Sequence, residues 1–151
     1  MRLDFWQKEP SFKLDSEQIS ILLDASSYRA KLLSLIKSAK QRIVITALYL
    51  QDDEAGREIL EALHQASNAN PELRVDILVD YHRAQRGLIG EAQSEGNAAL
   101  YLKLQQAYKN RVRVFGVPVK GKEVFGVLHL KGFIFDDTVV YSGADDNATG
   151  S

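Results

Sequence analysis

The sequence predicts an α/β domain with a mostly parallel sheet, flanking helices and a hairpin at its C-terminal end. Segments with apolar residues at helical spacing alternate with short, almost wholly apolar segments of strand length. The final apolar segment instead predicts two strands joined by a tight turn at Asp136-Asp137. A chain of 151 residues is long enough to form one domain with its own core.

Helices are predicted around residues 28–39, 55–66 and 100–108, where apolar side chains recur on one helical face. Ser26 or Ser27 is a suitable N-cap for the first helix, because a serine hydroxyl accepts a hydrogen bond from a free amide of the first turn.

Strands are predicted at residues 42–50, 75–80 and 112–117, which are short and apolar, and the first two are expected to be buried. We expect residues 1–25 to be a lead-in that docks on the domain through its apolar end. Residues 26–147 should form the domain, and residues 148–151 a polar tail.

The composition excludes several classes of protein. A hydrophobic content of 45% with 26% charged residues is ordinary for a globular domain, and a net charge of −1 excludes a globally basic binder. The absence of cysteine excludes disulfides, thiolate metal sites and cysteine nucleophiles, and it fits a cytoplasmic protein. The N-terminus is charged where a signal peptide would be apolar, and the longest apolar runs have strand length. Any membrane contact is therefore expected to be peripheral.

His129 and Lys131 carry the clearest chemical signal in the sequence. They alternate on a predicted strand, so both side chains should leave the same face. An imidazole can act as nucleophile or general acid on a phosphodiester, and an ammonium group can offset phosphate charge. The alternative is a strand whose polar face simply meets water.

The run HLKGFIFD fits the pattern H-x-K-x-x-x-x-D, and Gly143 follows it. This run resembles the signature of the phospholipase D superfamily, whose members transfer or hydrolyse phosphodiesters through a phosphohistidine. The flanking segments at residues 38–56, 79–90, 116–133 and 136–144 resemble the N-terminal half of the bacterial phosphatidylserine synthase family. The resemblance implies a phospholipase D-like domain whose C-terminal hairpin carries the motif.

The resemblance also implies roles for individual residues. His129 would be one of two catalytic histidines, Lys131 would bind phosphate oxygens, and Asp136 would complete the catalytic motif or brace the fold. A turn-forming aspartate is the alternative for Asp136. Asn147 would contact phosphate, although it stands one position later than in the superfamily pattern G-S-x-N, and Ala144 replaces the serine.

His82, Arg83 and Arg86 follow the predicted strand at residues 75–80, where open α/β sheets usually bind ligands. The resemblance makes them candidates for holding the pyrophosphate or nucleotide of the substrate. The alternative is a basic loop that pairs with neighbouring carboxylates.

The resemblance implies a CDP-diacylglycerol–serine O-phosphatidyltransferase, with CDP-diacylglycerol and L-serine as substrates. Two facing motifs are needed for this chemistry and the sequence contains one, so we expect a second catalytic half or a homodimer to complete the site. The alternatives are a homodimeric phosphodiesterase or nuclease and a non-catalytic phosphate-binding module. Nucleic acid is the less expected partner, and neither a cofactor nor a metal is proposed.

A basic strip could meet an anionic membrane surface, on the inner face of the membrane, or could simply be solvated. Its members are Lys109, Arg111, Arg113, Lys120, Lys122 and Lys131.

Overall fold

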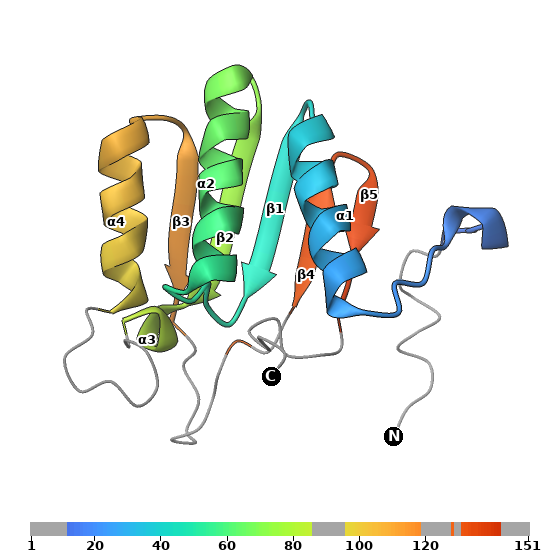
Figure 1. Cartoon of the computed structure of the whole chain (residues 1–151), viewed down its shortest axis with the longest axis horizontal. Helices are drawn as coiled ribbons and strands as arrows, with labels where there is room; N and C mark the ends of the chain where they lie inside the picture. The colour runs from blue at the N-terminus through green and yellow to red at the C-terminus, as the bar shows by residue number, and fades with distance from the viewer. Residues whose placement is uncertain (1–11, 86–95, 119–127, 129–130, 143–151) are drawn as a thin grey trace.

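The computed structural model describes residues 12–85, 96–118, 128 and 131–142 (Figure 1). Within these residues the chain forms a five-stranded sheet with the strand order β3-β2-β1-β4-β5. The strands are β1 (Arg42–Ala47), β2 (Arg74–Asp80), β3 (Val112–Val117), β4 (Gly132–Phe135) and β5 (Thr138–Val140). The sheet is parallel from β3 to β1 and antiparallel from β1 to β5. The predicted α/β class and the C-terminal hairpin are confirmed.

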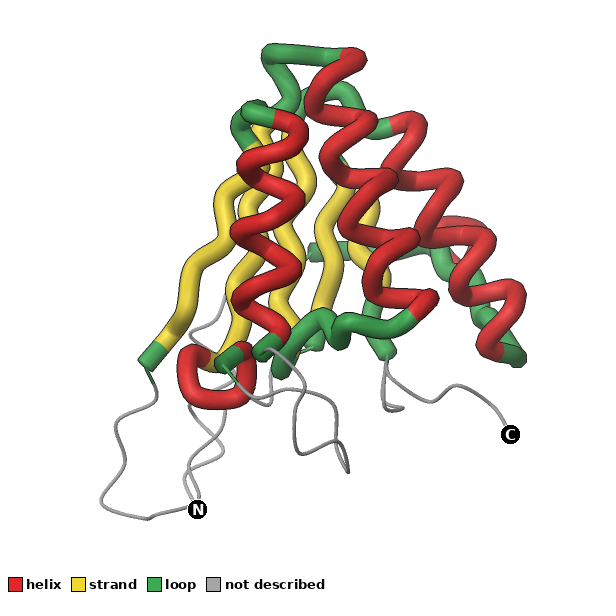
Figure 2. The backbone as a smooth tube through the Cα atoms, turned by 60° about the vertical axis from the view of Figure 1, so that its left-hand side comes forward, coloured by secondary structure: helices red, strands yellow, loops and turns green. Residues whose placement is uncertain are grey.

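The described helices are η2 (Ser16–Gln18), α1 (Ala25–Ser38), α2 (Glu54–Ala69), α3 (Tyr81–Ala84) and α4 (Asn97–Tyr108). Figures 1 and 2 show α1, α2 and α4 side by side in one layer against the same face of the sheet, with α1 packed on α2 and α2 on α4. None of the helices in the described ranges is long and apolar enough to cross a membrane.

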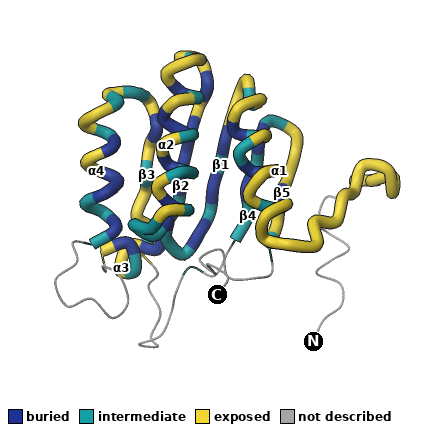
Figure 3. The backbone as a smooth tube through the Cα atoms, viewed as in Figure 1, coloured by how far each residue is buried: buried dark blue, intermediate teal, exposed yellow. Residues whose placement is uncertain are grey.

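The core lies between the sheet and this helix layer, as the dark blue segments of Figure 3 show. Alternate residues of the central strands face the helices because side chains alternate along a strand. Ile45 of β1 and Ile77 of β2 are paired in register and wholly buried, and Leu63 of α2 is also wholly buried. Each such side chain contributes about 1.5–3 kcal/mol relative to leaving it in water.

The opposite face of the sheet carries the alternate side chains, and many of these keep contact with solvent. Phe115 is 45% exposed and Val139 is 69% exposed. Asp76 is buried on this face, where it accepts hydrogen bonds from Arg74 Nε (2.6 Å) and Arg113 Nε (2.7 Å). The two guanidinium groups keep its charge paired, as a buried carboxylate requires.

The lead-in does not dock as expected over its described part. Phe12 is 84% exposed and Leu23 is 90% exposed, and Figure 1 shows this segment extending away from the helix layer. The short helix η2 is closed by its own capping interactions between Asp15 and Gln18, and none of its residues is buried. The described residues of this segment, 12–24, are therefore all exposed and do not pack on the domain.

The cap of α1 also differs from the prediction. Asp24 is the N-cap, and its carboxylate accepts hydrogen bonds from the backbone N–H (2.7 Å) and the hydroxyl (2.8 Å) of Ser27. An aspartate and a serine are about equally good caps, so the sequence alone did not separate them.

His64 of α2 is a buried part of the helix layer. Its Nδ1 lies 3.0 Å from Asn110 Oδ1, and its backbone C=O accepts a hydrogen bond from Asn110 Nδ2 (2.9 Å). The imidazole stacks on the ring of Tyr108. Burial lowers the pKa of His64 from its ordinary value of 6.5, although the hydrogen bond to Asn110 acts in the opposite direction.

This lowered pKa predicts a pH dependence of stability. The unfolded chain binds the His64 proton more tightly than the folded protein does, so protonation favours unfolding. The contribution of neutral His64 to the free energy of unfolding is present above about pH 6.5 and is lost as the pH falls through the lower folded pKa. We expect urea titrations from about pH 7 to about pH 5 to show a larger loss of stability for the wild type than for His64→Gln. Equal losses in the two proteins would contradict this assignment.

Candidate functional site

The candidate site lies at the edge of the sheet where β1, β2 and β3 end. Gly132, the first residue of β4, pairs with Thr46 near the end of β1 because the two strands are antiparallel. Lys131 directly precedes β4 and so lies at this edge. His82 and Arg83 belong to α3, which begins directly after β2 at the same edge. The structure therefore brings these three predicted site residues to one edge, where open α/β sheets bind ligands.

Helix α3 is held between the ends of β2 and β3. Tyr81 packs on Gly116 of β3 so closely that a Cβ at Gly116 would lie 2.8 Å from the Tyr81 ring, which only glycine allows. The rings of Tyr81 and His82 meet edge to face at 5.3 Å. His82 is exposed and Arg83 is half-buried, so the imidazole is available to solvent from a fixed position.

Asp80, the last residue of β2, connects α3 to the segment that precedes the histidine of the motif. Its side chain is 1% exposed. Its Oδ1 accepts a hydrogen bond from the backbone N–H of Arg83 (2.9 Å), and its Oδ2 accepts one from the backbone N–H of Leu128 (3.1 Å). Burial acts to raise the pKa of Asp80, but hydrogen bonds from the Arg83, Leu128 and His82 amides outweigh it and hold the pKa below 3.8. The carboxylate is therefore ionised at neutral pH.

The loop after β1 is fixed at the same edge by helix α4. The Tyr101 hydroxyl accepts a hydrogen bond from the Leu50 N–H (2.8 Å) and donates one to the Leu50 C=O (2.7 Å). The buried side chain of Asn97 accepts a hydrogen bond from the Asp52 N–H (2.9 Å). These contacts explain why β1 ends at Ala47, whereas its apolar sequence predicts a strand to residue 50.

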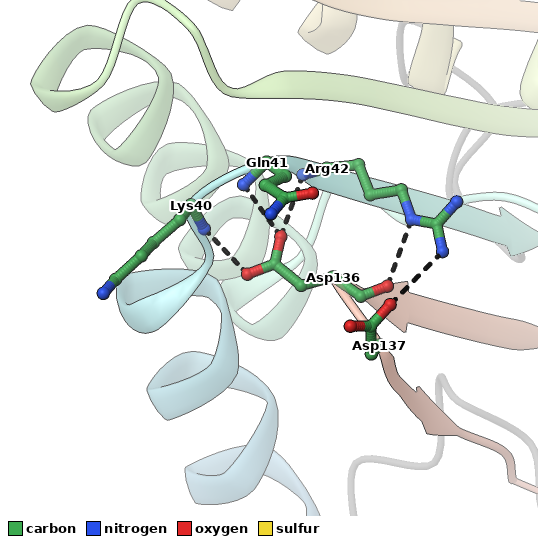
Figure 4. A network of polar contacts seen from close by, with 5 residues as sticks. All are labelled: Lys40, Gln41, Arg42, Asp136 and Asp137. Atoms are coloured by element: carbon green, nitrogen blue, oxygen red, sulfur yellow. Dashed lines mark hydrogen bonds and ion pairs between the residues drawn. The ribbon is translucent and has the colours of Figure 1, made fainter.

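Asp136 lies at the other end of β4, in the turn of the hairpin (Figure 4). Its carboxylate accepts hydrogen bonds from the backbone N–H groups of Lys40 (2.9 Å), Gln41 (2.8 Å) and Arg42 (3.0 Å). Its backbone N–H donates to the Arg42 C=O (2.9 Å), and its own C=O accepts from Arg42 Nε (3.1 Å). Asp136 thus joins the hairpin turn to the connection between α1 and β1.

The structure does not bring Asp136 to the edge that holds Lys131. β4 lies between the two residues, and the five residue steps from Lys131 to Asp136 span roughly 17 Å at about 3.3 Å per residue. The hydrogen bonds from Arg42, Lys40 and Gln41 lower the pKa of Asp136, so its charge is stabilised by these amides. These contacts favour bracing of the fold over contact with a phosphate beside Lys131.

Three predicted site residues, and part of the predicted basic strip, lie where the structure gives no description. His129, Arg86 and Asn147 lie outside the described residues, and their proposed roles stay predictions.

The basic strip is not continuous where it is described, because Lys109 and Arg111 precede β3 at its start while Lys131 lies at the opposite edge. In the described ranges, no group of three or more histidine or acidic side chains could hold a metal ion.

Comparisons with known proteins agree with this fold. The family described as "Cardiolipin synthase, PLD-like domain" matches residues 32–147. The CDP-diacylglycerol–serine O-phosphatidyltransferases of Haemophilus influenzae and Escherichia coli are each 48% identical to the chain, over 91% of its length. The mitochondrial CDP-diacylglycerol–glycerol-3-phosphate 3-phosphatidyltransferase of Gallus gallus is 30% identical over 90% of the chain.

A solved structure has a similar fold. The crystal structure of phosphatidylserine synthase from Haemophilus influenzae superimposes with a TM-score of 0.79 at 47% identity, covering 87% of this chain and 29% of that protein. The chain spans 31% of the length of each of the two bacterial relatives.

The contacts of Asp136 predict a loss of stability in Asp136→Asn. Asparagine tolerates the positive φ of 50° at this position, but its Nδ2 would face backbone N–H groups that now donate to the carboxylate. We expect the free energy of unfolding to fall by about 1–3 kcal/mol in urea titrations at neutral pH.

The pH dependence provides a further check on this loss. The folded pKa of Asp136 is lowered, so its stabilising contribution is present above 3.8 and is lost as the pH falls through the folded value. The difference between wild type and variant should therefore shrink below about pH 4. Asp137→Ala, which removes an exposed neighbour, is the control. If Asp137→Ala were as unstable as Asp136→Asn, the bracing interpretation would be wrong.

Proposed function

Because the chain belongs to the phospholipase D-like family, we propose that it forms one catalytic half of a phosphatidyltransferase. Its reaction would move a phosphatidyl group from CDP-diacylglycerol to L-serine. The observation that carries this proposal is the 48% identity to two bacterial serine O-phosphatidyltransferases across the segment that contains the motif. The placement of Lys131, His82 and Arg83 at one edge of the sheet supports it.

In the proposed reaction, two histidines share the chemistry. One attacks the phosphorus of the phosphatidyl group, so that a P–N bond forms and the P–O bond to CMP breaks, while the other donates a proton to the leaving CMP. The serine hydroxyl then attacks the phosphorus and loses its proton to the second histidine. A P–O bond forms, and the P–N bond breaks to free the first histidine. His129 takes one of these roles, and Lys131 offsets the charge on the phosphate oxygens.

The remaining predicted site residues have supporting roles in this proposal. His82, Arg83 and Arg86 would hold the pyrophosphate or nucleotide of CDP-diacylglycerol, since they follow β2 at the same edge as Lys131. Asn147 would contact the phosphate. Asp136 would brace the hairpin through the amides of residues 40–42 and would not touch the substrate.

Completion of the site requires a second motif. The sequence contains one H-x-K-x-x-x-x-D run, and the bacterial relatives are about three times as long as the segment they share with it. We propose that a second catalytic half supplies the other histidine; a second copy of this chain is the alternative. Because the donor is a membrane lipid, the reaction would take place at the cytoplasmic face of the membrane, with peripheral contact.

A second candidate differs only in the acceptor. The Gallus gallus relative is named for glycerol 3-phosphate, yet its name carries the same donor, CDP-diacylglycerol. The higher identity to the serine enzymes favours L-serine for this chain. Phosphodiester hydrolysis by a homodimer and phosphate binding without catalysis remain further alternatives.

The test is a chimera in which this chain replaces the aligned segment of the Haemophilus influenzae synthase. We expect the chimera to release CMP from CDP-diacylglycerol when serine is present, with slower release when glycerol 3-phosphate replaces serine. His129→Asn should lower CMP release by about 10³-fold or more, because an amide can neither attack phosphorus nor transfer the proton. His64→Gln, in the helix layer, is the matched control and should keep its activity.

Three results would count against the proposal. An inactive chimera would contradict the transferase function, and activity that survives His129→Asn would remove His129 from the chemistry. Light scattering of the chain alone, together with its own CMP release, tests the need for a second motif. Turnover by a confirmed monomer would show that one motif is enough.

A further inference from the structure

We propose that Asp80 is a positioning residue for the phosphatidyl transfer: its carboxylate fixes the backbone that leads into the catalytic motif against the helix that carries His82 and Arg83. This inference rests on the proposed function, because it assigns Asp80 to the same site. Asp80 itself is too deeply buried to touch a substrate, with an exposed fraction of 1%.

The two carboxylate oxygens of Asp80 have different partners, from segments that are far apart in the sequence. Oδ1 accepts the backbone N–H of Arg83, three residues later, and so caps α3. Oδ2 accepts the backbone N–H of Leu128, which is 48 residues later and directly precedes His129. One side chain therefore joins the two parts of the chain that supply the proposed phosphate-binding groups.

The bond to Leu128 limits where the motif residues can lie. Four residues later, Gly132 is held by pairing with Thr46 of β1. The chain from Leu128 to Gly132 therefore runs between two fixed points, and even a fully extended segment of this length spans only about 13–14 Å. His129 and Lys131 stand between these points in the sequence. The bond to Asp80 ties down the Leu128 end of this segment, and the pairing with Thr46 ties down its β4 end.

The position of Asp80 is itself firmly determined. Its backbone N–H donates to the Leu48 C=O (3.0 Å), which joins the ends of β1 and β2. Leu48 belongs to the loop that Tyr101 and Asn97 hold against α4. Asp80 can therefore transmit the geometry of the core to the edge of the sheet, as a residue that orients catalytic groups must do.

Aspartate is the residue that this arrangement requires. An ionised carboxylate has two acceptor oxygens, whereas an asparagine side chain has one acceptor oxygen and an NH₂ group that only donates. In Asp80→Asn, one of the two backbone N–H groups loses its acceptor and faces another donor. If the cap of α3 is kept, the bond to Leu128 is lost, and the reverse also holds.

The experiment compares Asp80→Asn with Asp53→Asn in the chimera described above. Asp53 is the matched control because it also caps a helix, with its carboxylate accepting the Gly56 N–H (2.8 Å), and its described contacts do not include residues 128–142. We expect Asp80→Asn to lower kcat by ~10²-fold with little change in KM, because misplaced groups reduce the rate of the chemical step. Asp53→Asn keeps an acceptor for the Gly56 N–H, so it should stay close to the wild type in stability and keep its kcat within about twofold.

A second measurement uses the chain alone and does not depend on turnover. Inorganic phosphate is titrated into ¹⁵N-labelled chain while the backbone amide signals of Leu128 and Lys131 are followed. We expect Asp80→Asn to speed hydrogen exchange at Leu128 and to weaken phosphate binding by about tenfold, whereas Asp53→Asn changes neither. If Asp80→Asn does not fold, Leu128→Pro removes the same hydrogen bond from the donor side and should give the same losses.

The outcomes separate this inference from the proposed function. An active chimera in which Asp80→Asn and Asp53→Asn have equal kcat would overturn the positioning role and leave the transferase function intact. An inactive wild-type chimera would overturn the function, and the phosphate titration would then decide the role of Asp80. Equal phosphate affinities in the two variants, or no phosphate binding by the wild type, would refute it.

Discussion

The antiparallel pairing of β4 with β1 is the interaction on which the candidate site depends. The strands β1, β2 and β3 all end at one edge, and a strand that runs in the opposite direction must begin there. Lys131, directly before β4, therefore lies at that edge. Had β4 been parallel to β1, the same residue would lie at the opposite edge, beside Arg42. The change of direction at β1 therefore sets Lys131 at the edge where α3 begins, and the buried register of Ile45 with Ile77 and Phe133 holds β4 in place.

Two aspartates stabilise the ends of this arrangement by the same physical means. Each carboxylate accepts hydrogen bonds from backbone N–H groups that lie outside the regular pairing of helices and strands. These hydrogen bonds lower the pKa of each aspartate. Asp136 ties the hairpin turn to the start of β1, whereas Asp80 ties the end of β2 to Leu128. Because a hydrogen bond to a charged acceptor is stronger than one between neutral groups, a single side chain can hold each junction. One carboxylate thus holds the turn of the hairpin, and the other holds Leu128, four residues before β4.

Much of this fold was predictable from hydrophobic pattern, since helices and parallel strands have different periods. The strand at Val112–Val117 agrees with its prediction, and the motif was recognised from the spacing of His129, Lys131 and Asp136 together with the flanking sequence. The end of β1 was not predictable, because the apolar run continues to Leu50 while a contact with Tyr101, 51 residues away, turns the backbone. Asp80 was missed as a site residue for the same reason. Its local signal was an acid at the end of a buried strand with Arg83 three residues later, which indicates a helix cap. The partner that gives it a place in the site, Leu128, is distant in sequence and contributes only an amide.

The contacts of Asp136 in the hairpin turn explain why the family motif includes an aspartate. Asp136 combines a positive φ with three amide contacts, so its place in H-x-K-x-x-x-x-D reflects the architecture of the hairpin. In the proposed reaction His129 and Lys131 act on the phosphate, whereas the contacts of Asp136 stabilise the hairpin turn. Under the proposed function, selection would therefore act differently on the three motif residues. A descendant that has abandoned catalysis but still needs the domain should keep the aspartate and drift at the other two positions. In a collection of related sequences, we therefore expect the aspartate to indicate the fold, and the histidine and lysine together to indicate catalysis.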